Sequence, residues 1–339
     1  MQLDHCAQLS FYMDGGETLK KSLKLSALLA GMGVLLVLLW IFFPKQIAAT
    51  PKELSSTDEI WLITDPHYLS PELHDQDVAF QKMQNTAAGK DLVYSKERME
   101  ALVAQVESER PKVLIVSGDM TFNGEYQSFI ELAEFFKRIE ALGTTVLVEP
   151  GNHDIADGWA RKFQDNENYK IKQMTAADFP NVFAEYGYSE ASSRDTHSLS
   201  YMAKPFTKLW FLMIDSNIYE KNGEGKGAPK TGGVIPKETL EWIDKELAAA
   251  HSAGVQVIPV MHHNLLTHHE FNPDGFVVDN ASDLKVIFNQ YDNVTLGFSG
   301  HIHTQQIATE KMSADRSYTE IVNGVFCLSV YHRQINDEP

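Results

Sequence analysis

Several strand-like apolar runs of this chain end directly in short clusters of aspartate, asparagine and histidine, and this arrangement restricts the fold more than any other feature. Five such clusters occur in one order: Asp65-Pro66-His67, Gly118-Asp119, Gly151-Asn152-His153-Asp154, Met261-His262-His263 and Gly300-His301-Ile302-His303. In an α/β sheet, ligands bind just outside the carboxyl ends of the strands. The pattern therefore predicts an α/β fold in which strand ends bring these side chains to one cleft.

The chemistry of the clusters indicates a metal site. Together they supply three aspartates, one asparagine and several histidines, an inventory that suits two metal ions better than one. His301 and His303 can face the same cleft, because alternate residues of an extended segment point the same way. Asp65-Pro66-His67 by itself is more typical of a turn, so the prediction rests on the joint occurrence of the clusters.

The apolar and amphipathic patterns after Glu59 predict one α/β domain over residues 59–339. The expected strands are Ile60–Thr64, Lys112–Ser117, Thr145–Glu149, Leu209–Ile214, Val255–Val260, Val294–Phe298 and Gly324–Val330. Helical periodicity predicts helices at Lys96–Ser108, at Tyr126–Leu142 and from Pro236 onward. Three segments have neither pattern and are expected to form the rims of the cleft: Ile155–His197, Ser216–Ile235 and Asn264–Ser282. The last residues, Ile335 to Pro339, offer no closing element, so we expect the domain to be truncated there.

The tract Leu25–Phe43 predicts a membrane anchor. Its 19 residues contain no charge, and a helix of this length spans roughly 28 Å, close to the hydrocarbon thickness of a bilayer. Three lysines precede the tract, which predicts that residues 1–24 stay in the cytoplasm, that residues 25–43 cross the membrane once as a signal-anchor, and that everything after the linker 44–58 is extracytoplasmic. The alternative is a signal peptide cleaved near Ile47-Ala48-Ala49, which would give a secreted protein.

Charge and cysteine content narrow the class of partner. The net charge of −17 argues against a nucleic-acid polymer, whereas a small phosphate ester remains compatible because two divalent ions would reverse the local charge. The two cysteines, Cys6 and Cys327, would lie on opposite faces of the membrane and provide no disulfide framework. The sequence carries no signal for an oligomeric state.

In this order the clusters resemble those of the calcineurin-like metallophosphoesterase family, over the range Ile60 to His303. The resemblance implies an αββα sandwich of two sheets with a dinuclear metal centre at the carboxyl ends of central strands. It also implies three groups of metal ligands: Asp65, His67 and His303 for the first ion, Asp119 as the bridge, and Asn152, His262 and His301 for the second ion. His263 is then expected to pack or hydrogen-bond behind them.

The same resemblance implies that His153 is the catalytic imidazole, which donates a proton to the leaving oxygen or stabilises the charged phosphoryl group, and that Asp154 orients it. A hydroxide shared by the metals would attack phosphorus in line. The ligand set suits manganese or iron, with zinc as an alternative. One departure from the family pattern is Phe122, where many relatives have a second aspartate and purple acid phosphatases have a metal-binding tyrosine.

The motifs around Asp65 and the stretch Gly118 to Glu125 look most like exported bacterial phosphoesterases related to class III cyclic nucleotide phosphodiesterases. This resemblance predicts phosphodiester hydrolysis with a 3′,5′-cyclic nucleotide as the leading substrate. The alternatives are a phosphomonoesterase or nucleotidase, a hydrolase of phospholipid headgroups, and a surface-binding module without catalysis. Tyr68, Asn123 and His197 are further candidates for contact with the ester.

Overall fold

The computed structural model describes residues 51–155, 158–219, 230–271 and 274–327. The predicted anchor at 25–43 lies outside these ranges, as do the stub and most of the linker. Within the described part of the chain, no helix has both the length and the apolar character needed to cross a bilayer.

Two sheets form the centre of the domain. The first is parallel, with the order β1-β2-β3, and consists of β1 (Ile60–Ile63), β2 (Val113–Ser117) and β3 (Thr145–Glu149). The second has the order β11-β12-β10-β9-β8-β7-β6. Its strands are β6 (Ser193–Arg194), β7 (Tyr201–Ala203), β8 (Leu209–Ile214), β9 (Gln256–Met261), β10 (Leu296–Ser299), β11 (Gln306–Lys311) and β12 (Ser317–Val322). The neighbours β8, β9, β10 and β12 are parallel, so their carboxyl ends share one edge.

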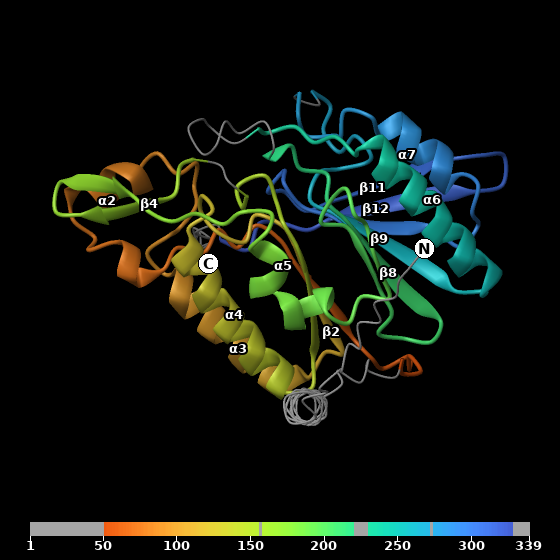
Figure 1. Ribbon diagram of the computed structural model, residues 1–339, viewed down its shortest axis with the longest axis horizontal. Helices are drawn as coiled ribbons and strands as arrows, with labels where there is room; N and C mark the ends of the chain where they lie inside the picture. The colour runs from red at the N-terminus through yellow and green to blue at the C-terminus, as the bar shows by residue number, and fades with distance from the viewer. Residues whose placement is uncertain (1–50, 156–157, 220–229, 272–273, 328–339) are drawn as a thin grey trace, which may run out of the picture. The chain divides into compact units, whose positions relative to one another are not determined.

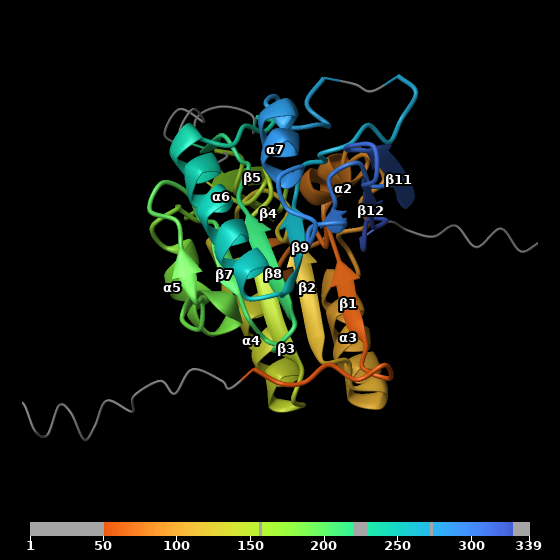
Figure 2. The same ribbon diagram turned by 90° about the vertical axis from the view of Figure 1, so that its right-hand side faces the viewer.

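Helices cover the outer face of each sheet (Figures 1 and 2). On the first sheet lie α3 (Ser95–Glu109) and α4 (Tyr126–Ala141), and on the second lie α6 (Lys237–Ser252) and α7 (Ala281–Phe288). The helix α3 buries a stripe of Met99, Leu102, Val103 and Val106, which recur at the helical period. The predicted helices Lys96–Ser108 and Tyr126–Leu142 are therefore confirmed to within one residue at each end, and the predicted start of the third at Pro236 is confirmed to within one residue.

The strand β8 shows why the layers stack in this way. Phe211 and Met213 belong to the core shared with the first sheet, whereas Leu212 and Ile214 belong to the core beneath α6. Successive side chains of a strand point to opposite faces, so a continuous apolar run is buried on both sides. The order helix, sheet, sheet, helix confirms the predicted αββα sandwich within the described residues.

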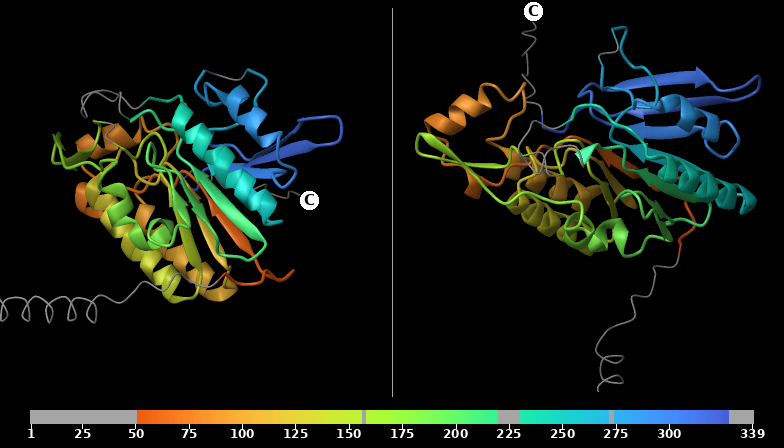
Figure 3. Two further views of the ribbon diagram at one scale, coloured as in Figure 1. Left: turned by 45° about the vertical axis from the view of Figure 1, so that its right-hand side comes forward. Right: turned by 45° about the horizontal axis from the view of Figure 1, so that its top comes forward.

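A third, smaller group of elements lies beyond the carboxyl end of the first sheet, and the sequence patterns did not reveal it. It contains the short helices η1 (Pro71–Leu73) and α2 (Val78–Gln84) and the hairpin of β4 (Arg161–Gln164) and β5 (Glu167–Lys170). Its apolar core joins Phe80 of α2 to Phe163 of β4, with ring centroids 6.1 Å apart, and α2 and the hairpin lie side by side in Figure 3. The predicted irregular segment Ile155–His197 also contains α5 (Phe179–Val182) and η2 (Ala184–Tyr188).

Two strand predictions near the end of the chain need correction. Residues 324–327 form turns and coil instead of the start of the predicted strand Gly324–Val330, whose last three residues lie outside the described ranges. The strands β11 and β12 were missed. Almost all of β11 is exposed, and the inward positions of β12 include the charged Glu320, so neither shows a clean apolar alternation. Glu320 is tolerated there because its carboxylate accepts hydrogen bonds from the backbone N–H groups of Leu265 and Leu266.

Candidate metal centre

The predicted ligands converge at the carboxyl ends of strands from both sheets. Asp65, Asp119 and Asn152 follow β1, β2 and β3, while His262 follows β9 and His301 follows β10. Parallel strands end at a common edge, which explains how clusters up to 236 residues apart meet.

Four of these side chains form a first group. Asp65, His67, Asp119 and His303 each offer a ligand atom within 4.8 Å of the others. Within it, the Nε2 atom of His303 lies 3.2 Å from Oδ1 of Asp65 and 3.2 Å from Nε2 of His67. All but His303 are buried.

A second group shares Asp119 with the first. It comprises Asp119, His262 and His301, again within 4.8 Å. The Nε2 atom of His262 lies 3.4 Å from Oδ1 of Asp119, 3.2 Å from Nδ1 of His301 and 3.1 Å from Oδ1 of Asn152. All seven predicted ligands are thus brought together, with Asp119 between two sets of donors.

In His262 and in His301, one ring nitrogen lies within hydrogen-bond distance of a backbone carbonyl, and the other ring nitrogen faces the cleft. Nδ1 of His262 lies 3.0 Å from the carbonyl oxygen of Ser117, and Nε2 of His301 lies 3.0 Å from that of Gly275. When these nitrogens donate to the carbonyls, Nε2 of His262 and Nδ1 of His301 keep their lone pairs. Histidines that bind metals commonly make this kind of second contact.

The donor set fits a pair of cations. Asp65 Oδ1 is buried without a hydrogen-bond partner, although buried acceptors are nearly always satisfied. The cleft also brings ring nitrogens of two imidazole pairs to 3.2 Å of each other, close enough for a cation to be held by both rings of a pair. Carboxylate, amide and imidazole ligands without thiolate suit manganese, iron or zinc.

The backbone around the centre adopts conformations that side chains usually avoid. Nine non-glycine residues of the described chain have positive φ angles, and five of them are predicted ligands: Asp65, His67, Asp119, His301 and His303. Such conformations cost roughly 1–3 kcal/mol each and persist where the surrounding structure enforces them, most often at functional sites. The turns after the strands are therefore shaped to aim these side chains.

Two glycines of the motifs permit the close approach of neighbouring loops. A Cβ atom on Gly151 would lie 2.1 Å from the backbone nitrogen of Asp119, and one on Gly300 would lie 1.8 Å from Oγ1 of Thr64. Real side chains do not tolerate either distance, so the glycines of these motifs allow the ligand loops to pack against one another.

The environment of His153 corrects one prediction. Its Nδ1 atom lies 3.0 Å from Oδ1 of Asn123, and its backbone nitrogen donates to Asp119 Oδ1 over 2.8 Å. The expected pairing of Asp154 with the His153 ring is wrong. Asn123 had been predicted only as a candidate for contact with the ester, and its place next to the unusual Phe122 is a weak signal for its role beside His153.

Asp154 instead holds the loops together. Its carboxylate accepts hydrogen bonds from the backbone nitrogens of Met120, Thr121 and Gly151 over 2.8–2.9 Å. These bonds join the loop after β2, which carries Asp119, to the loop after β3, which carries Asn152. Burial, with help from the nearby Asp119 charge, raises the pKa of Asp154 to about 7 despite these bonds. Asp154 therefore supports the ligands without touching the imidazole.

Burial and neighbouring charges shift the pKa values of the side chains in the centre in different directions. Burial opposes ionisation of Asp119, but the charges of His262 and His153 hold its pKa well below the ordinary value. The Asp119 carboxylate in turn outweighs burial and raises the pKa of His262 to about 9. Burial, reinforced by His262, lowers the pKa of His301 to about 4. The centre thus attracts positive charge strongly at Asp119.

A buried lysine lies near this acidic cleft. Lys90 is only 8% exposed, and no ion pair of its ammonium group occurs within the described ranges. The next residue, Asp91, donates its N–H to the carbonyl of Cys327, and the adjacent Phe326 donates to the carbonyl of Thr64, which precedes the ligand Asp65. Burial is the main cause of the lowered pKa of His153, and the positive charge of Lys90 contributes to it.

Three other residues singled out in the sequence lie outside the two donor groups. His263 lies behind the ligands, with Nδ1 2.8 Å from Ser216 Oγ and Nε2 3.0 Å from the carbonyl of Thr231, as expected. Tyr68 is 1% exposed and donates its hydroxyl to Glu131 over 2.7 Å, so it packs between helices. His197 lines a separate small crevice beside Asp215.

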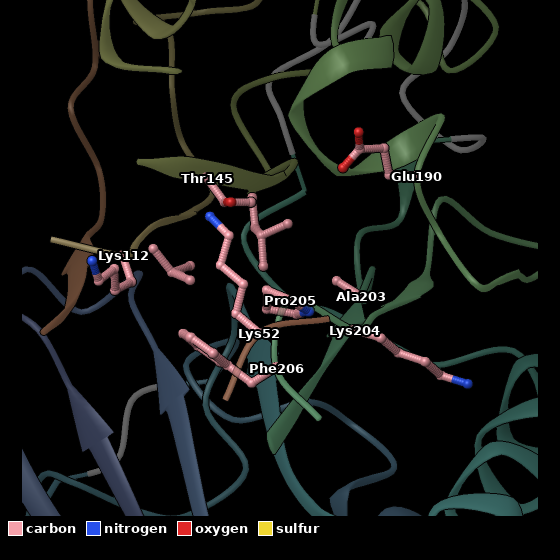
Figure 4. Close-up of a pocket in the computed structure, with 10 residues that line it drawn as sticks. Lys52, Lys112, Thr145, Glu190, Ala203, Lys204, Pro205 and Phe206 are labelled. Atoms are coloured by element: carbon pink, nitrogen blue, oxygen red, sulfur yellow. The ribbon is translucent and has the colours of Figure 1, made fainter. Parts of the chain in front are cut away.

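Two hollows differ in their relation to the centre. A crevice of about 80 Å³ lies at the amino ends of β2 and β3, where Lys52 reaches toward Thr145 and Lys204 extends away (Figure 4). It contains none of the motif residues, because it lies at the opposite end of the strands. A larger groove of about 440 Å³ includes Asn123, the residue in contact with His153.

Comparison with known proteins agrees with this geometry. The family model described as calcineurin-like phosphoesterase matches residues 59–305, which include every cluster of the centre. The chain belongs to this family. Calcineurin-like phosphoesterases depend on a dinuclear metal centre, and the two groups that share Asp119 are the candidate site for it.

Two relatives of this chain have low sequence identity to it. A protein of a Psychrobacter species named "Probable cyclic nucleotide phosphodiesterase" is 23% identical over 67% of this chain and 55% of its own length. A 3′,5′-cyclic-nucleotide phosphodiesterase of a Nostoc species is 21% identical over 72% of this chain and 70% of its own length. The chain thus spans only about half the length of the Psychrobacter relative.

A solved structure supports the fold. The crystal structure of a dimetal phosphatase from Danio rerio superimposes with a TM-score of 0.55 and 15% identity, covering 80% of this chain and 89% of that chain. At this identity the likeness concerns the arrangement of the sheets and helices alone.

Proposed function

We propose that the chain hydrolyses phosphodiesters and that its leading substrate is a 3′,5′-cyclic nucleotide. One observation carries the reaction class: two groups of buried donors meet at a single shared carboxylate, Asp119. The names of the Psychrobacter and Nostoc relatives support a cyclic nucleotide as substrate.

In this proposal the seven ligands divide as the motifs indicate. Asp65, His67 and His303 would hold one ion, Asn152, His262 and His301 would hold the other, and Asp119 would serve both. When bound, the two ions supply a lowered pKa for water and positive charge for the phosphoryl oxygens. The rigid, positive-φ loops fix the ligands before substrate arrives, so little reorganisation is needed in the transition state.

His153 moves the proton in this scheme. Asn123 Oδ1 accepts a hydrogen bond from Nδ1–H, which fixes the plane of the ring and leaves Nε2 for the substrate. Once protonated, the ring would give its Nε2 proton to the leaving oxygen as the ester bond breaks. The negative charge of the bound ester opposes the lowering of the His153 pKa by burial and by Lys90. Lys90 adds a positive charge near His153, where it would attract the anionic ester.

The experiment compares diester with monoester turnover. The purified full chain is stripped with chelator, reloaded with manganese, and assayed with 3′,5′-cyclic AMP and with 4-nitrophenyl phosphate. We expect metal-dependent formation of nucleoside monophosphate, with a higher kcat/KM for the cyclic diester. A higher kcat/KM for the monoester would make the protein a phosphomonoesterase or nucleotidase instead, and no turnover of either would favour a binding module.

We also propose that residues 25–43 anchor the protein in the cell membrane, with the domain from residue 59 outside the cytoplasm. The support is the uncharged tract and the lysines before it. Protease added to intact cells should remove the catalytic domain while a tag on the amino terminus stays protected. Release of the domain into the medium without protease would indicate signal cleavage and secretion.

A further inference from the structure

The groove beside His153 is built by the third group of elements. Its lining comes from three places: α2, the loop after β2, and the segment that leads into the hairpin of β4 and β5. Asn123 joins the groove to the centre, because the same side chain lines the groove and contacts His153. A substrate whose leaving oxygen faces His153 would therefore extend its organic part into this groove.

Two aromatic residues line the groove, Phe122 and Trp159. Phe122 is buried, whereas Trp159 is 47% exposed although it is large and apolar. Met83 of α2 lines the groove as well. An exposed indole in a groove that adjoins the centre through Asn123 suits a planar ring, and stacking of a nucleobase on such a ring contributes about 1–3 kcal/mol.

The charge of the groove is opposite to that of the chain. Lys82 and Arg161 line it, and none of its lining residues is acidic, whereas the chain has a net charge of −17. The Arg161 guanidinium is held in place, since Nη1 donates to the carbonyls of Gly158 and Ala160 over 3.1 and 3.0 Å. Fixed cations in a locally acid-free groove favour an anionic ligand.

We propose that this groove is the subsite for the nucleoside part of a nucleotide, with the base against Trp159 and the phosphate toward His153. The inference rests on the proposed function and adds the source of its specificity. A volume of about 440 Å³ is in the range of pockets that hold small organic ligands. The ligand class is a nucleoside phosphate, which combines the planar ring and the negative charge that the groove matches.

Binding of a product nucleotide tests the subsite separately from turnover. The metal-loaded full chain is titrated with AMP and with ribose 5-phosphate, which has the same phosphate without a base, and binding is measured by calorimetry. We expect AMP to bind at least tenfold more tightly, from the stacking contribution. Equal affinity for the two ligands would overturn the proposal, even if the protein hydrolyses phosphodiesters.

Variants identify the surface that binds the base. Trp159→Leu should weaken AMP binding about tenfold and leave ribose 5-phosphate binding unchanged, while Trp159→Phe should keep most of the preference. The matched control is Tyr169→Leu, which removes a ring that is 51% exposed on β5 of the same hairpin but outside the groove. Equal AMP affinity in Trp159→Leu and Tyr169→Leu would overturn the assignment, whereas AMP preference without hydrolysis would refute only the proposed function.

Discussion

The metal centre and the groove beside it are neighbours, yet they are built in different ways. The centre uses turns directly after five buried strands, and most of its side chains are buried and fixed by hydrogen bonds. The groove uses α2 and the β4–β5 hairpin, which belong to the long connections between strands, and Lys82, Trp159 and Asn168 at its rim are exposed. From this difference we expect that side chains of the centre determine the reaction and that side chains of the groove determine which substrate binds. Changes in the centre should alter turnover, and changes in the groove should alter binding.

The largest expected effect tests the shared carboxylate. Asp119→Ala should lower kcat on the order of 10³-fold or more, because charge stabilisation of several kcal/mol is lost together with the bridge between the ions. Elemental analysis of the purified variant should also show reduced metal content. The control Asp315→Ala removes an exposed carboxylate between β11 and β12, outside both donor groups. Full activity of Asp119→Ala would refute the bridging role.

The pairing of His153 with Asn123 gives the next largest effect. His153→Ala should lower kcat by about 10²–10⁴-fold, the usual contribution of a general acid. Asn123→Ala should lower kcat by about tenfold, and the double variant should be no slower than His153→Ala, because Asn123 acts through the ring. Additive losses in the double variant would show that Asn123 acts independently of the imidazole.

A smaller loss is expected at Lys90, which lies at the border between the two regions. Lys90→Gln should lower kcat/KM by about tenfold, since a nearly buried cation adds attraction for an anionic ester. Lys90→Arg keeps the charge and should retain more activity, and Lys96→Gln, an exposed lysine on α3, is the matched control. The role is excluded if Lys90→Gln and Lys96→Gln have the same kcat/KM.

The smallest expected effect is on the free energy of unfolding. It concerns Glu125, which accepts a hydrogen bond from the loop that joins the centre to the groove. Burial raises the pKa of Glu125 to about 8 from an ordinary 4.5, and its Oε2 accepts the N–H of Asn123 over 2.9 Å. The folded protein therefore holds this proton more tightly than the unfolded chain, so stability falls as pH rises from about 4.5 to 8.

Glu125→Gln removes the carboxyl group whose deprotonation causes this fall in stability. We expect urea denaturation at pH 8 to show the variant more stable than the wild type by about 1 kcal/mol or more, with a smaller difference at pH 5. The phenolic control Tyr169→Phe should leave the pH dependence unchanged. A constant difference between Glu125→Gln and wild type over this pH range would contradict the raised pKa.

Strand positions, and the polar clusters at the strand ends, were predictable from the sequence where a local pattern reflects burial. Buried strands such as β2 and β8 are continuous apolar runs, and each ligand cluster follows such a run. The strands β11 and β12 were not predictable, because one is an exposed edge and the other places Glu320 inward. The partner of His153 was also missed, since adjacency in sequence pointed to Asp154 while the turn after β3 directs that carboxylate to backbone N–H groups.

The sequence by itself determined the α/β class and the inventory of donors, because strand periodicity and side-chain chemistry are local properties of the chain; the αββα sandwich and the grouping of donors around Asp119 were implied by the family resemblance. Only the tertiary structure decided that Asn123 rather than Asp154 contacts the imidazole, and that Trp159 and Arg161 line one groove with α2. These relations join residues distant in the chain. They depend on turn conformations and on the packing of long connections, which the amino-acid order does not display directly.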